Sequence, residues 1–287
     1  MSPIIFALIS YFGWGIGDIF GTIAVRKIGT YSVTFWSYIL TLLILCLYIP
    51  FALVDLNQIN FSIVALNIFL GLVVLPGAIL YGEAMTIGNA SLVTTVAASF
   101  TALVVIFSVL FLKETITQMQ LWAIIIIFLG LILTNLDLKQ IFKRSFKVDK
   151  SIMLAFVVMF LWGIYFTFIK IPVRQIGWYW SNLFSFSVTP LLFVYIKIKS
   201  IKLNNPLNKK VIVPFFAGTI LVMMADLSYN FAIGKGLAAV IAPIAGAYPT
   251  LFVVLAFLVF KDKITKQQIV GIITTLAGIV LLSFFSA

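Results

Sequence analysis

Three charged side chains lie deep inside long apolar stretches of this sequence: Asp18, Lys170 and Asp226. A charged group that faces lipid is costly, so such groups usually face a cavity or a partner. A carboxylate in that position can bind a proton or the ammonium group of a solute. We therefore expect Asp18 and Asp226 to lie in a cavity. For Lys170 two placements stay open: a pair with Asp226, or a side chain that extends to the lipid headgroups.

Aromatic and amide side chains suited to binding an amphipathic solute occur in the same stretches. At helical spacing, Trp14 lies one turn from Asp18, and Asn230 lies one turn from Asp226. The complete set of candidate substrate-binding residues is Tyr11, Trp14, Asp18, Tyr81, Trp162, Lys170, Asp226, Tyr229 and Asn230.

A catalytic alternative starts from Gly15-Ile16-Gly17-Asp18, which reads G-x-G-D and resembles a motif of intramembrane aspartyl proteases. Such enzymes need a second aspartate that shares one proton with the first. The other deep aspartate, Asp226, follows Ala225 where those proteases have tyrosine. Counting residues along antiparallel helices puts the two carboxylates roughly 12 Å apart along the membrane normal, because a helix rises about 1.5 Å per residue. We therefore expect a protein that is not an enzyme.

Cysteine and histidine usage narrows the chemistry further. The sequence has no histidine and one cysteine, Cys46. Serine–histidine hydrolysis, histidine-based metal ligation and zinc sites built from cysteine clusters all need residues that this chain lacks. No nucleotide-binding loop is present, so ATP does not drive this chain. We expect no cofactor and no metal.

The composition indicates a membrane protein. Of 287 residues, 63% are hydrophobic and 9% are charged, against about 25% charged in an ordinary soluble domain. A span needs about 20 apolar residues. Ten such segments can be marked: 3–25, 32–54, 61–85, 90–112, 117–136, 151–171, 178–198, 211–233, 238–260 and 266–285. The first segment lacks a charged start and an A-x-A-like cleavage site, so we expect it to remain as a span.

The sequence repeats itself at an offset of 148 residues. Trp14-Gly15-Ile16 recurs as Trp162-Gly163-Ile164, and Val25-Arg26-Lys27-Ile28-Gly29 recurs as Val173-Arg174-Gln175-Ile176-Gly177. Five spans in each half would invert the second copy relative to the first, as in many secondary transporters. We expect an all-α polytopic membrane protein with ten transmembrane helices in two inverted five-helix repeats. The predicted domains are a first repeat at 1–137, a basic connector at 138–150 and a second repeat at 151–287.

The formal net charge of +11 is distributed unevenly between the two ends of the spans. Fifteen of the 19 lysines and arginines fall in the connections after the first, fifth, seventh and ninth spans, and four fall on the opposite side. Basic connections stay in the cytoplasm, so both termini are predicted to lie outside it. A basic face also binds anionic lipid headgroups. This distribution favours membrane topology, not nucleic-acid binding, as the reason for the charge.

Glycine and proline residues indicate how the helices pack. Gly13, Gly17 and Gly21 recur every fourth residue, and such a stripe lets two helices approach closely in lipid. Pro76, Pro243 and Pro249 are the candidate helix breaks. Helix breaks often mark transporter substrate sites, although a plain kink is at least as common.

Paired motifs across both halves are similar to those of one transporter family. The second copy has Trp162, Gly163, Phe166 and Lys170, whereas Thr22 stands at the lysine position in the first copy. Further family positions match in both copies. Those of the first copy are Tyr81, Ala84, Ala90, Glu114, Thr117, Gln120 and Gly130, and their equivalents in the second copy are Tyr229, Ala232, Ala238, Asp262, Thr265, Gln268 and Gly278. The family's proline matches only in the second copy, as Pro249. The chain resembles the EamA-type branch of the drug/metabolite transporter superfamily.

The resemblance implies a central cavity lined by the first, third, fourth, sixth, eighth and ninth spans, and alternating access that usually exports amino acids, metabolites or toxic compounds. We expect a secondary transporter for a small organic metabolite, amino-acid-like or amphipathic, in the cell membrane. Its partners would be the small-molecule substrate, protons and membrane lipids, and no nucleic acid. The alternatives are a passive channel or lipid scramblase and, less favoured, an intramembrane aspartyl protease.

Overall fold

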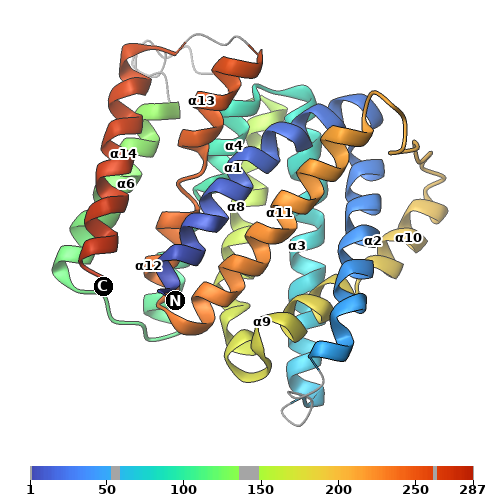
Figure 1. Cartoon of the computed structure of the whole chain (residues 1–287), viewed down its shortest axis with the longest axis horizontal. Helices are drawn as coiled ribbons and strands as arrows, with labels where there is room; N and C mark the ends of the chain where they lie inside the picture. Colours follow the sequence, from blue (N-terminus) through green and yellow to red (C-terminus); the bar gives the residue numbers. More distant parts are fainter. Residues whose placement is uncertain (1, 53–58, 136–148, 261–263, 287) are drawn as a thin grey trace.

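The computed structural model describes residues 2–52, 59–135, 149–260 and 264–286. Over these ranges the chain forms a bundle of helices without strands (Figure 1). Nine helical segments of the described chain are long and apolar enough to cross a membrane, and Gln118–Thr134 is a shorter apolar helix. The all-α polytopic class predicted from the composition is thereby confirmed.

The first repeat comprises α1 Pro3–Ile28, α2 Thr30–Tyr48 with the 3-10 turn η1 Ile49–Phe51, α3 Phe61–Ile87, α4 Ala90–Ala98, α5 Phe100–Leu110 and α6 Gln118–Asn135. The second repeat comprises α8 Lys150–Phe168, α9 Lys170–Phe186, α10 Thr189–Ile198, α11 Ile212–Lys235, α12 Ala238–Ala245, α13 Pro249–Phe260 and α14 Lys266–Phe284. Most of the predicted connector 138–150 lies outside the described residues.

The same turn follows the first helix of each repeat. Gly29 has φ +83° and Gly177 has φ +78°, a backbone region that favours glycine. The two glycines are 148 residues apart, so they occupy equivalent positions. In the second repeat, residues on both sides of Gly177 belong to α9, which therefore holds the end of the sixth span and the start of the seventh.

Of the three prolines predicted to break helices, two lie inside continuous helices. Helix α3 continues through Pro76, and α12 contains Pro243. A proline removes one backbone hydrogen bond, and membrane helices tolerate that loss where neighbouring helices, side chains or local adjustments satisfy the freed group. Only Pro249 stands at a helix start, after the short connection between α12 and α13. A break that the sequence did not predict separates α4 from α5 at Ser99.

The first helix of each repeat packs against a helix of the other repeat. Helix α1 packs along α11, and α8, its equivalent, packs along α3 (Figure 1). A Cβ atom at Gly13 would lie 2.8 Å from Ala225 Cβ, and one at Gly17 would lie 2.8 Å from Val222 Cγ2. The predicted close approach through the glycine stripe is therefore observed between α1 and α11. Gly21 differs, because its Cβ position is open.

The last helices of the repeats, α6 and α14, pack against each other at one side of the bundle (Figure 1). A Cβ at Gly278 would lie 2.9 Å from the backbone nitrogen of Ile127. This pair contributes no residue to the cavity lining described below, although both helices pack against α12. The site described next is built from α1, α2, α3, α8, α9 and α11, together with single residues at the start of α5 and next to α13.

Candidate functional site

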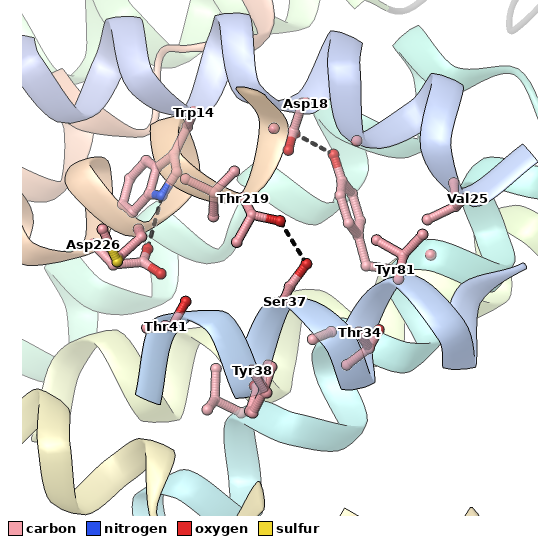
Figure 2. Close-up of a pocket in the computed structure, with 18 of the residues that line it drawn as sticks. Trp14, Asp18, Val25, Thr34, Ser37, Tyr38, Thr41, Tyr81, Thr219 and Asp226 are labelled. Atoms are coloured by element: carbon pink, nitrogen blue, oxygen red, sulfur yellow. Dashed lines mark hydrogen bonds between the residues drawn. The ribbon is translucent and has the colours of Figure 1, made fainter. Parts of the chain in front are cut away.

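A cavity of about 220 Å³ lies between the two repeats. Helix α1 contributes Trp14 and Asp18, α3 contributes Tyr81, and α11 contributes Asp226 (Figure 2). Trp162 of α8 completes the group of predicted site residues that line the cavity. The structure thus brings five of the nine candidate residues to one place.

Asp18 is held by a tyrosine from the third helix of its own repeat. The Tyr81 hydroxyl donates to Asp18 Oδ2 at 2.5 Å and lies 3.1 Å from Thr94 Oγ1 (Figure 2). Tyr81 can reach across because Gly82, beside it, lets α3 approach the start of α2 at Thr30. The Tyr81 hydroxyl is a neutral partner for this carboxyl group.

Asp226 has a corresponding neutral donor. Trp14 Nε1 donates to Asp226 Oδ1 at 2.8 Å, which ties α1 to α11 across the repeat boundary (Figure 2). The small residues Gly13 and Ala225 bring the two helices close enough for this contact. The two carboxylates each have their own partner, and no hydrogen bond joins them among the contacts of the described residues.

The cavity floor is a cluster of aromatic rings from both repeats. The ring of Trp14 lies 5.3 Å from that of Phe166 and 5.8 Å from that of Tyr248, centroid to centroid. Phe100 stacks on Phe166 at 4.7 Å, and Trp162 lies 4.9 Å from Tyr81. At these separations the rings pack against one another, and these residues also line the cavity.

Helix α2 supplies a polar wall that the sequence analysis did not single out. Thr34, Ser37, Tyr38 and Thr41 line the cavity from this helix. Ser37 Oγ lies 2.7 Å from Thr219 Oγ1 of α11, so this hydroxyl pair faces the space between the carboxylates (Figure 2). The spacing of three and four residues along α2 is the signal that would have revealed this stripe. The lining therefore includes the second and seventh spans, which the family resemblance did not imply.

Lys170 does not pair with Asp226 and does not extend to the headgroups. Its ammonium forms a buried ion pair with Glu114 and donates to the backbone oxygen of Gly236 at 2.7 Å. Glu114 also accepts from the backbone nitrogens of Ala238 at 3.0 Å and Ala239 at 2.9 Å. These amides begin α12 and lack partners within the helix, so a carboxylate is favourable there. Both predicted placements of Lys170 were wrong.

The remaining candidate residues lie in the core behind the cavity and not on its lining. The Tyr11 hydroxyl is 2.9 Å from Thr250 Oγ1, and the Tyr229 hydroxyl donates to the backbone oxygen of Phe166 at 3.2 Å. Asn230 Nδ2 donates to Asn182 Oδ1 at 3.0 Å. Pro76, Pro243 and Pro249 are likewise absent from the lining residues described.

The cavity extends toward one end of the bundle only. Its lining residues on α1 run from Trp14 to Val25, and those on α11 run from Asp226 back to Pro214. Both runs lead to the end where α1 finishes and α11 begins. At the opposite end the rings of Phe166 and Tyr229 pack against Trp14 in edge-on and tilted arrangements, and the Lys170–Glu114 pair lies beyond them.

Comparisons with known proteins agree with this architecture. Each half of the chain is matched separately: the sequence profile of the EamA-like transporter family fits residues 1–136 and again 149–284. An uncharacterized protein of Methanocaldococcus jannaschii is 30% identical over 137 residues, which cover 47% of this chain and 98% of that protein. One solved crystal structure superimposes with a TM-score of 0.78 over 99% of this chain and 97% of its own, at 12% identity.

The solved structure shows the fold, and the profile shows the family, because its two matches cover both repeats. The chain belongs to the EamA-like transporter family.

Proposed function

We propose that this protein is a secondary transporter that carries a small organic metabolite, amphipathic or amino-acid-like, by alternating access. The observation that carries the proposal is the central cavity, which both repeats line and which extends toward one end of the bundle. Members of the EamA-like family are transporters. A cavity between inverted repeats can reach either side when one repeat rocks against the other.

The two ends of the cavity support a gated pathway in preference to an open pore. The aromatic cluster and the Lys170–Glu114 pair close the end that holds the chain termini. The cavity extends toward the end that carries most of the basic connections. With the predicted topology, the substrate would enter from the cytoplasm and be exported across the cell membrane, with both termini outside the cytoplasm.

Asp18 and Asp226 are proposed to bind the substrate or to couple its movement to protons. Each carboxylate lines the cavity and has a neutral hydrogen-bond donor as its partner. A carboxylate so placed can exchange a proton for a solute group as the protein changes state. Asn at either position preserves the shape and removes the charge.

The experiment has two stages. Purified protein in detergent is screened against amino acids, amines, nucleosides and organic acids by thermal shift, and each stabilising compound is then tested for counterflow in proteoliposomes. A transporter accumulates labelled solute against an excess of unlabelled solute inside and saturates with concentration. Uptake without saturation or counterflow would indicate a channel, and lipid scrambling without solute movement would indicate a scramblase.

The coupling proposal is tested with the substrate that this screen identifies. The variants Asp18→Asn and Asp226→Asn should fold, yet at least one of them should lose uptake driven by a pH gradient. Glu83→Gln is the matched control, because Glu83 is a carboxylate of α3 outside the cavity lining. Wild-type rate and pH dependence in both asparagine variants would exclude the two aspartates from the mechanism.

A further inference from the structure

We infer that the cavity selects a small organic cation, in preference to a zwitterion or a neutral solute. The inference rests on the proposed transport function and names its substrate class. It starts from the charges of the lining. Among the described lining residues, the only acidic side chains are Asp18 and Asp226, and none is a lysine or arginine.

The rest of the molecule makes this local charge unusual. The whole chain has 19 basic and eight acidic residues, and two of those eight acids face the same cavity of about 220 Å³. Lys170, the cationic residue among the candidates predicted from the sequence, is already paired with Glu114 and donates a hydrogen bond to the backbone oxygen of Gly236. Neither aspartate receives a protein cation, since their donors are an indole and a phenol. A solute cation would supply the missing counter-charge.

The same lining disfavours a solute that carries its own carboxylate. An amino acid needs a cationic or strongly donating partner for its carboxylate, and this lining offers no lysine or arginine. Two aspartates would instead repel it. The hydroxyl pair of Ser37 and Thr219 provides neutral hydrogen bonding for a polar substituent between the charged positions.

Aromatic rings supply the remaining recognition. The cavity lining next to the carboxylates includes Trp14, Tyr81 and Trp162. Trp14 also donates a hydrogen bond to Asp226, and Tyr81 donates one to Asp18. The face of a tryptophan or tyrosine attracts an ammonium group, and desolvation strengthens the attraction. A carboxylate beside an aromatic face suits an alkylated ammonium, which donates few or no hydrogen bonds.

The basic residues at the cavity end do not cancel this field. Arg26 donates to the backbone oxygen of Met85, and Lys27 donates to that of Lys210. Neither residue belongs to the cavity lining. Charges exposed to salt water are screened beyond about 8 Å at physiological ionic strength, whereas charges within the protein are screened much less.

The test uses three probes of nearly the same shape: choline, its neutral isostere 3,3-dimethylbutan-1-ol, and the zwitterion glycine betaine. Binding to purified protein is measured at equilibrium by calorimetry, with tetramethylammonium, tetraethylammonium and putrescine as further cations. At least one cation should bind saturably. Where choline binds, the neutral and zwitterionic isosteres should bind about tenfold more weakly or worse, a gap of about 1.4 kcal/mol.

Variants locate the binding. Asp18→Asn or Asp226→Asn should weaken cation binding by about tenfold or more, Asp226→Glu should retain the cation preference, and Glu83→Gln should bind as the wild type does. The ranking of probes on the wild-type protein needs no variant, so a variant that fails to fold does not decide the result. Equal binding of the isosteres, preference for betaine, or no binding of any cation would overturn the inference.

The outcomes separate this inference from the transport proposal. Cation binding without counterflow would support the selectivity and reject transport. Counterflow of a neutral or zwitterionic solute, abolished in the aspartate variants, would support transport and reject the cation selectivity.

Discussion

The two repeats share a backbone plan and place different chemistry at equivalent positions. In the first repeat, the Tyr81 hydroxyl donates to the carboxylate of Asp18. At the positions 148 residues later, the Tyr229 hydroxyl donates to the backbone oxygen of Phe166, whose ring packs against Phe100. One tyrosine therefore contacts a carboxyl group at the cavity, and its equivalent contacts the backbone of a residue whose aromatic ring lines the cavity.

A second pair of positions extends the contrast. Thr22 donates to the backbone oxygen of Asp18, whereas its equivalent Lys170 forms the buried pair with Glu114. The start of α4 is capped by its own Asn89, but Leu237 at the start of α12 has no side chain that could cap, and Glu114 of the other repeat takes that role. Divergence between the two copies therefore places a buried ion pair toward one end of the bundle and the cavity toward the other.

The first prediction concerns which end faces the cytoplasm, and its effect is all or none. The end with the chain termini should lie outside, because the basic connections lie at the other end. A C-terminal fusion to alkaline phosphatase should be active, and one to a fluorescent protein should be dark. Bright fluorescence with a silent phosphatase would reverse the orientation of the two ends and leave the helix count unaffected.

The second prediction concerns the buried ion pair of Lys170 and Glu114. Lys170→Met should lower the free energy of unfolding by about 3–5 kcal/mol, because it leaves Glu114 as a buried charge without its partner. The measurement is thermal and denaturant unfolding in detergent. The double variant Lys170→Met/Glu114→Gln is the control and should recover part of the loss. A single variant as stable as the wild type would mean that the pair contributes nothing to this end.

The third prediction compares two glycines of one stripe. Gly17→Leu should destabilise by about 1–3 kcal/mol, because its side chain would overlap Val222 of α11. Gly21→Ala, one turn further, meets open space and should melt at the wild-type temperature or slightly above it. Melting curves in one detergent test both. Equal behaviour of the two variants would contradict the close approach of α1 and α11.

The smallest effect sharpens the comparison of the two tyrosines. Tyr81→Phe and Tyr229→Phe should each lower stability by about 0.5–1.5 kcal/mol, the usual contribution of one hydrogen bond. Only Tyr81→Phe should also change solute binding, because its hydroxyl contacts Asp18 at the cavity. Parallel unfolding and binding measurements separate the two. An equal change in solute binding by the two variants would contradict this difference between the two tyrosines.

The fold follows from sequence features that are local or periodic. The offset of 148 residues and the apolar segments predict the repeats and the spans, and the stripe of Gly13 and Gly17 predicts a close helix pair. The partner of that pair was not predictable, since nothing in the spacing of α1 names α11. Continuous helix through Pro76 was also not foreseen, because tolerance of proline depends on the neighbours.

The site was harder to predict because its geometry depends on contacts between distant residues. The apolar surroundings of Asp18 and Asp226 indicated a cavity, and the structure places both at one. The partner of Lys170 depends on how the connection to α12 brings Gly236 and Ala238 near Glu114, and no periodicity encodes that contact. The hydroxyls of α2 were visible in the sequence, but neutral polar residues are common in membrane helices and draw little notice.

Because α1 packs against α11 of the other repeat, the first helix is synthesised well before its partner. Ser10 of α1 donates to the backbone oxygen of Ala225, 215 positions along the chain. A ribosome adds roughly 5–20 residues per second, so the first helix made waits roughly 10–40 s for its partner. During that interval the face of α1 that carries Gly13 and Gly17 lacks its α11 partner. A nascent chain that stops before α11 therefore presents an unpaired helix to the membrane's quality-control machinery.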